Sequence, residues 1–169
     1  MGSAPERLWK VGILTLSDKG SRGEREDLSG RAIRELLDPA SYRVDLYAVI
    51  PDEREQIVET LVEWVDDRGL DLVLTTGGTG LSPRDVTPEA TERVIERAIP
   101  GMAEAMRWAS LQKTPHAMLS RAVVGVRGRC LVANLPGSPR GVRENLQVLL
   151  PALPHALEKL QGDPSECAT

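Results

Sequence analysis

Short apolar segments alternate with segments of helical periodicity along most of this chain, and that order restricts the fold more than any other feature. Residues 10–16 (KVGILTL) and 70–76 (LDLVLTT) are typical of buried strands, and residues 42–50 of a strand nearer the edge of a sheet. Residues 121–126 and 130–135 are also strand-like, and the RGR between them is short enough for a hairpin. Strands and helices in this order predict a three-layer α/β structure with a mainly parallel sheet.

The helices expected between these strands carry start and stop signals. Asp27 or Ser29 could cap the first helix, after a polar loop over residues 17–27. Thr87 and Pro88 predict the capped start of another helix, which is expected to end near Pro100. Further helices are expected within residues 101–113, 136–150 and 151–162.

Length and composition point to one domain. The chain has 169 residues and no internal repeat or linker, so we expect a single domain over 1–169 with its core at about 10–161. A formal charge of −4 argues against a nucleic-acid binder. No segment resembles a signal peptide or membrane helix, and Cys130 and Cys167 suit neither a disulfide framework nor a zinc site. These features predict a cytoplasmic protein with no nucleic-acid or membrane partner.

Polar, glycine-bearing loops follow three of the expected strands. They begin at Ser17, Thr75 and Asn134, and parallel strands bring their carboxyl ends to one edge of the sheet, where such folds bind ligands. The second loop, TTGGTGLSPRD, lacks the lysine of a P-loop, and Pro83 interrupts the GxGxxG dinucleotide pattern. Its glycines would still let backbone N–H groups approach an anion closely, as would those of the third loop, NLPGSPRG. Tight turns that bind no ligand are the alternative.

Four aspartates lie beside these strand ends, namely Asp18, Asp27, Asp52 and Asp85. Mg²⁺ prefers one or two carboxylates together with phosphate oxygens, so this group predicts a cation site. Asp27, Asp52 and Asp85 could each help to cap a helix instead.

Five segments in a fixed order resemble one known family. They are LTLSDKGSRGEREDLSG, IPDERE, TTGGTGLSPRDVTPEAT, LSRAVVGVRG and NLPGSPRG. Over about 10–161 the chain is similar to the molybdopterin-binding family of molybdenum cofactor biosynthesis. The resemblance implies a trimeric α/β protein that binds molybdopterin, a pterin with a dithiolene and a terminal phosphate. Catalytic members of that family are molybdopterin adenylyltransferases, which join this phosphate to AMP from Mg-ATP and release pyrophosphate.

The same resemblance implies roles for individual residues. Asp52 and Asp85 match the aspartate pair of the adenylylating members, which implies that they act in catalysis and bind Mg²⁺. Substrate binding is implied for Ser17, Asp18, Asp27, Ser29, Thr76, Gly77, Gly78, Thr79, Gly80, Ser120, Asn134, Pro136, Gly137 and Ser138. The substrates would be ATP and molybdopterin, and a protein that inserts molybdate would be a transient partner.

Two other functions stay open at this point. A carrier or scaffold would bind molybdopterin without reacting it, and the glycine loops alone do not distinguish it from an enzyme. A generic flavodoxin-like small-ligand domain would have no affinity for a pterin.

Overall fold

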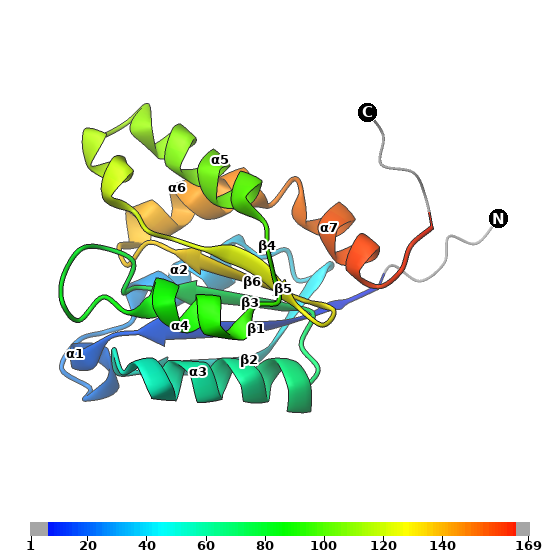
Figure 1. Cartoon of the computed structure of the whole chain (residues 1–169), viewed down its shortest axis with the longest axis horizontal. Coiled ribbons are helices and arrows are strands. Elements are labelled where there is room, and N and C mark those ends of the chain that lie inside the picture. The colour runs from blue at the N-terminus through cyan, green and yellow to red at the C-terminus, as the bar shows by residue number, and fades with distance from the viewer. Residues whose placement is uncertain (1–6, 165–169) are drawn as a thin grey trace.

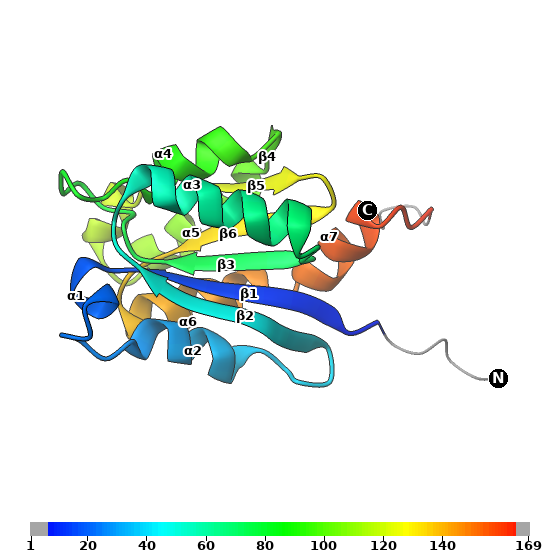
Figure 2. The ribbon, with the colours of Figure 1, turned by 90° about the horizontal axis from the view of Figure 1, so that it is seen from below.

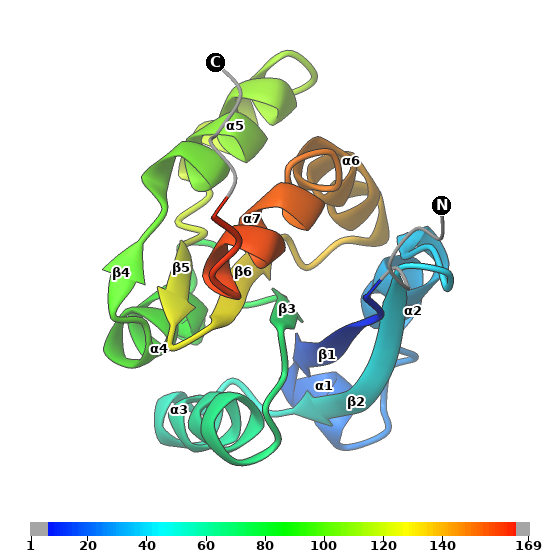
Figure 3. The same ribbon diagram turned by 90° about the vertical axis from the view of Figure 1, so that its right-hand side faces the viewer.

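A six-stranded sheet forms the centre of the computed structural model, which describes residues 7–164 (Figure 3). Its strand order is β2-β1-β3-β6-β5-β4, and the first four of these strands are parallel. β5 is antiparallel to β6, and β4 is antiparallel to β5. The strands are β1 (Trp9–Leu16), β2 (Tyr42–Ile50), β3 (Leu72–Thr76), β4 (Arg97–Ala98), β5 (Val124–Arg127) and β6 (Cys130–Leu135). The predicted mainly parallel sheet, the edge position of residues 42–50 and the hairpin before residue 130 are confirmed.

Helices cover both faces of this sheet, which gives the predicted three layers (Figures 1 and 2). One face is covered by α3 (Arg54–Val62), the π-helical turn η1 (Glu63–Asp67) and α4 (Thr87–Val94). The other face is covered by α2 (Leu28–Leu36), α5 (Pro100–Leu111), α6 (Pro139–Leu149) and α7 (Leu153–Leu160). Two short elements remain, α1 (Asp18–Ser21) and the 3₁₀ turn η2 (Pro115–Leu119).

Each face of the sheet has its own apolar core. Successive side chains of a strand point to opposite faces, so Ile13 belongs to the core under α2 and α6, and Leu14 to the core under α3 and α4. Since both faces are covered, β1 and β3 consist of almost entirely buried residues. The loops at their carboxyl ends are therefore attached to a closely packed platform.

Both ends of the described chain lie at the same end of the molecule, which is the amino end of the parallel strands (Figure 1). Arg7 and Asp163 both line one cavity of about 460 Å³ there. Among residues 7–164, no helix is long and apolar enough to cross a membrane.

Three local predictions are wrong. The loop over residues 17–27 contains the short helix α1, because Ser17 accepts a hydrogen bond from a backbone N–H three residues on. Thr87 is the first residue of α4 rather than its cap, and its hydroxyl donates to Gly77 O at 2.9 Å. That helix ends at Val94 and not near Pro100, because residues 97–98 pair with β5 as the strand β4.

One cysteine can be placed. Cys130 is buried in β6 as a free thiol, and burial raises its pKa to about 12. Cys167 lies outside the described residues.

Candidate active site

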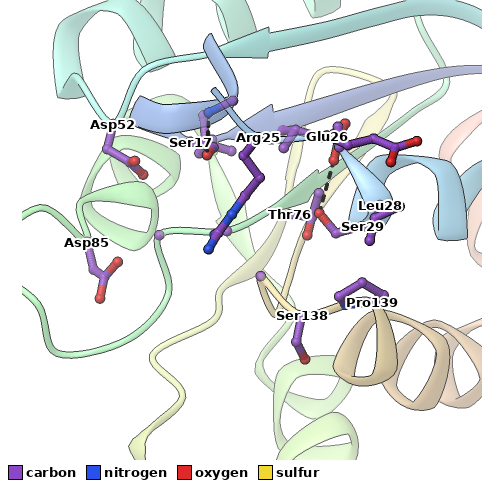
Figure 4. A pocket seen from close by; sticks show the side chains of 17 residues that line it. Ser17, Arg25, Glu26, Leu28, Ser29, Asp52, Thr76, Asp85, Ser138 and Pro139 are labelled. Carbon is purple, nitrogen blue, oxygen red and sulfur yellow. Dashed lines mark hydrogen bonds between the residues drawn. The ribbon is translucent and has the colours of Figure 1, made fainter. Parts of the chain in front are cut away.

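The loops that follow β1, β2, β3 and β6 meet at the carboxyl end of the sheet around a cavity of about 660 Å³ (Figure 4). The three glycine-bearing loops therefore come together as predicted. Most of the residues expected at the site line this first cavity: Ser17, Asp27, Ser29, Asp52, Thr76, Gly77, Gly78, Asp85, Gly137 and Ser138.

Two glycines after β3 allow the loop backbones to touch one another. Gly77 and Gly78 have φ angles of +98° and +65°, a region that favours glycine. A Cβ on Gly77 would lie 2.4 Å from Leu16 O, and one on Gly137 would lie 3.3 Å from Gly77 Cα. The loops after β1, β3 and β6 are thus in backbone contact, and side chains at these glycines would force them apart.

Threonine hydroxyls hold the glycine loop in place. Thr76 Oγ1 donates to Pro136 O at 2.6 Å, and Thr87 Oγ1 donates to Gly77 O at 2.9 Å. The backbone N–H of Thr87 also donates to Gly78 O at 3.1 Å. The loop therefore presents a fixed backbone to the cavity, where exposed N–H groups can bind an anion.

Asp52 is oriented by a reciprocal pair of hydrogen bonds with Asp18. Asp18 N donates to Asp52 Oδ2, and Asp52 N donates to Asp18 Oδ1, both at 3.0 Å. The guanidinium of Arg84 bonds both oxygens of the Asp18 carboxylate, at 2.9 and 3.0 Å, and Glu53 at 2.8 Å. Asp18 does not line the cavity, and its carboxylate contacts Asp52 and Arg84. No described residue donates a hydrogen bond to Asp52 Oδ1.

Asp85 faces the same cavity from the loop before α4 (Figure 4). Its Oδ2 accepts a hydrogen bond from Ser82 N at 2.9 Å.

The pKa of Asp52 is raised in the folded protein. Burial raises it, the charges of Asp18 and Asp85 raise it further, and the hydrogen bond from Asp18 N and the charge of Arg84 oppose these effects. Two carboxylates whose charges repel, with oxygens left unbonded by the protein, fit Mg²⁺, which takes one or two carboxylates together with phosphate oxygens.

Asp27 belongs to the framework of the site. It caps α2 by accepting a hydrogen bond from Gly30 N at 2.9 Å, so Asp27 and not Ser29 is the cap. It also accepts hydrogen bonds from Thr15 at 2.7 Å, from Ser29 at 3.1 Å and from the Tyr47 hydroxyl. Burial acts to raise the pKa of Asp27, but these hydrogen bonds outweigh it and the pKa is lowered.

The structure gives the four aspartates near the predicted cation site different surroundings. Over residues 7–164 no three or more His, Cys, Asp or Glu side chains form a group that could hold a metal ion. Arg84 neutralises Asp18, and hydrogen bonds occupy Asp27. Of the four, only Asp52 and Asp85 face the cavity with oxygens available to a cation.

A second cavity, of about 620 Å³, adjoins the first, because Ser138 lines both. Ser138 also caps α6 by accepting a hydrogen bond from Gly141 N at 3.0 Å. The predicted residues Thr79, Gly80, Ser120 and Pro136 line this second cavity, together with the basic residues Arg107, Lys113, His116 and Arg140. The predicted ligand residues are therefore divided between two neighbouring spaces.

Asn134 lines neither of the two cavities, and its side chain bonds residues of the framework behind them. It is fully buried, and its amide nitrogen donates to the hydroxyls of Thr75 and Thr91, both at 2.9 Å. Its Oδ1 accepts a hydrogen bond from Val123 N at 3.1 Å. The side chain thus ties β6 to β3 and α4.

Three arginines of the site were not predicted from the sequence. Arg25 lines the first cavity, and Arg84 bonds Asp18 as described. Arg121 donates to Gly80 O at 2.8 Å and to Asp85 O at 2.7 Å, which fixes the loop that carries Asp85. All three lie inside the motifs quoted above, but an arginine in a polar loop is usually a solvated surface residue.

Comparisons with known proteins agree on the kind of domain. A family model described as a probable molybdopterin binding domain matches residues 12–155. The molybdopterin adenylyltransferase of Helicobacter pylori is 44% identical over 158 residues, which cover 90% of this chain and 88% of that protein. The molybdopterin adenylyltransferase of Escherichia coli K12 is 43% identical over 141 residues, or 82% of this chain and 72% of that protein. The crystal structure of the molybdopterin biosynthesis enzyme MoaB from Thermus thermophilus matches with a TM-score of 0.87 at 55% identity, over 94% of this chain and 100% of that one.

Proposed function

The chain belongs to the family of probable molybdopterin-binding domains, and from that premise we propose that it is a molybdopterin adenylyltransferase. It would transfer AMP from Mg-ATP to the terminal phosphate of molybdopterin and release pyrophosphate. The observation that carries the proposal is the pair Asp52 and Asp85, which faces a cavity lined by glycine-loop backbone. The adenylyltransferases that are 43–44% identical to this chain support it.

The reaction joins two polyanions. An oxygen of the pterin phosphate forms a bond to the α-phosphorus of ATP, and the bond from that phosphorus to the bridging oxygen breaks, so the electron pair leaves with pyrophosphate. The attacking phosphate is largely ionised at neutral pH, since its second pKa is about 6. The protein therefore needs neither a covalent nucleophile nor a general base, and its task is to position the reactants and to offset their charge.

The residues of the first cavity suit that task. Asp52 and Asp85 would hold Mg²⁺, which supplies charge neutralisation and orients the leaving pyrophosphate. Backbone N–H groups of Gly77, Gly78 and residues 137–138 would donate hydrogen bonds to phosphate oxygens. Because the two cavities adjoin at Ser138, each can take one substrate while the reacting phosphates meet between them.

Turnover tests this proposal directly. Purified protein with molybdopterin, ATP and Mg²⁺ should release one pyrophosphate for each adenylylated pterin detected by mass spectrometry. Asp85→Asn should lower turnover by at least about 100-fold, since losing a metal ligand removes several kcal/mol of charge stabilisation. Asp67→Asn is the matched control, because Asp67 is an exposed aspartate of η1 that lines neither cavity. Tight binding of molybdopterin with no consumption of ATP would instead support a carrier or scaffold of the same family.

Assembly and location form part of the same proposal and rest on the family resemblance. We infer a homotrimer that acts in the cytoplasm, with transient contact to a protein that inserts molybdate. Light scattering after size exclusion should give the mass of three chains, and a monomer at micromolar concentration would contradict the assembly.

A further inference from the structure

The first cavity is poor in positive charge for a site that takes phosphates. Four carboxylates line it, those of Glu26, Asp27, Asp52 and Asp85. Among the residues that the structure describes, Arg25 is the one basic side chain in its lining. A cation held by Asp52 and Asp85 would balance the charge of that pair alone, so the phosphates of two substrates call for a further positive group in the cavity.

Arg25 is placed to supply it. It lies in the segment between α1 and α2, and its side chain extends into the cavity between the Asp52 and Asp85 side and the Ser138 side (Figure 4). An arginine at this point brings a permanent charge and five donors in a planar fork that matches phosphate oxygens.

Neighbouring arginines are engaged elsewhere. Arg22 bonds Glu24 at 2.8 and 3.0 Å, and Arg31 bonds Glu26. Within residues 7–164, Arg25 makes no ion pair or side-chain hydrogen bond, and it is exposed. Its guanidinium is therefore not needed for the fold, and its donors are available to a ligand.

We propose that Arg25 is a catalytic residue of this chain that binds a substrate phosphate in the first cavity, between the aspartate pair and Ser138. The inference rests on the proposed function for the identity of the substrates. Arg25 keeps its proton throughout and forms no covalent bond. It contacts the phosphate oxygens on which charge is redistributed as the new bond to the α-phosphorus forms and the bond to pyrophosphate breaks.

The decisive comparison is between two arginines of the same loop. Arg25→Ala should lower kcat/KM by about 100-fold, the size of effect seen when one positioned donor is removed from a reacting centre. Arg25→Lys keeps the charge but loses the planar fork, so its activity should lie between those of Arg25→Ala and the parental protein. Arg22→Ala removes an exposed arginine that does not line the cavity, and should keep the parental value. Thermal midpoints of all three variants should equal that of the parental protein, because neither arginine supports a packed element.

A binding measurement separates this inference from the proposed function. Calorimetry with inorganic tripolyphosphate and Mg²⁺ should show a dissociation constant about 10-fold higher for Arg25→Ala than for the parental protein. If the parental protein shows no turnover but this difference remains, the proposed function fails and the phosphate contact of Arg25 stands. If Arg25→Ala matches Arg22→Ala in both binding and turnover, the inference is overturned. A rise in KM for ATP alone would assign Arg25 to the nucleotide phosphates, and a rise for molybdopterin alone would assign it to the pterin phosphate.

Discussion

Gly78→Ala tests how closely the loops of the site are packed, without any ligand. Gly78 has a φ of +65°, and a Cβ at this position would lie 2.3 Å from Thr87 Oγ1 and 3.1 Å from Asp52 Oδ1. Gly69 is the matched control, because its φ is +63° and a Cβ there would meet no atom within 4 Å. The two substitutions therefore share the backbone cost and differ only in the collision.

The expected sizes follow from these contacts. An alanine in the left-handed region costs about 1 kcal/mol of folding free energy, which is all that Gly69→Ala should lose. At Gly78 the side chain of Thr87 must also move, which breaks its hydrogen bond to the carbonyl oxygen of Gly77. That loss adds roughly 2 kcal/mol because the freed groups are buried. Gly78→Ala should thus lose about 3 kcal/mol.

Denaturation measures both changes. For a chain of this size 1 kcal/mol shifts the thermal midpoint by roughly 2–4 °C, so calorimetry should find a fall of about 3 °C for Gly69→Ala and about 9 °C for Gly78→Ala. Placing Gly78→Ala in a Thr87→Ala background should bring its additional cost closer to that of Gly69→Ala, since the colliding hydroxyl is gone and only the contacts with Asp52 Oδ1 at 3.1 Å and the residue-87 Cβ at 3.3 Å remain. Equal losses for the two single variants would refute the close packing described here.

Three further predictions concern single side chains. Asn134→Ala should destabilise the protein by about 3 kcal/mol in urea denaturation, because three buried hydrogen bonds are lost, while turnover per folded molecule stays at the parental value. Tyr47→Phe should raise the pKa of Asp27, which is lowered in the folded protein; the variant should be less stable than the parental protein at pH 7. That difference should shrink as the pH falls through the lowered pKa of Asp27, below 3.8, as urea titrations at several pH values would show. In a Cys167→Ser background, Cys130 should resist iodoacetamide at pH 8 in the native state and react after unfolding, since its pKa is about 12 and it is buried.

The central strands of the sheet could be predicted because burial on both faces requires a short, mostly apolar run in the sequence. The strands β1 and β3 are covered by helices on each side, so nearly all of their residues are buried and most of them are apolar. The shortest helix and strand have no comparable pattern in the sequence. α1 has four residues and depends on a cap at Ser17, and β4 has two residues and exists only through its pairing with β5, so neither has a period that can be detected.

The location of the candidate site could be predicted from the sequence, but not which of its charged side chains are paired with one another. Spacing put four aspartates near strand ends, but which of them are neutralised depends on contacts between distant parts of the chain. Arg84 lies 66 residues from Asp18 in the sequence and bonds it at 3.0 Å in the fold. Asn134 shows the same limit, since its partners Thr75 and Thr91 become neighbours only when the sheet and α4 assemble.

Because both ends of the described chain lie at one end of the molecule, a circular permutation is feasible. Arg7 and Asp163 line one cavity, so a short linker could join them at the pole of the molecule opposite the glycine loops. New termini could be opened at the exposed turn around Gly128, between β5 and β6. Such a chain would pass through the strands in a different sequence while their order in the sheet stayed the same. The site depends on which strand ends are neighbours, and not on the order in which the polypeptide visits them.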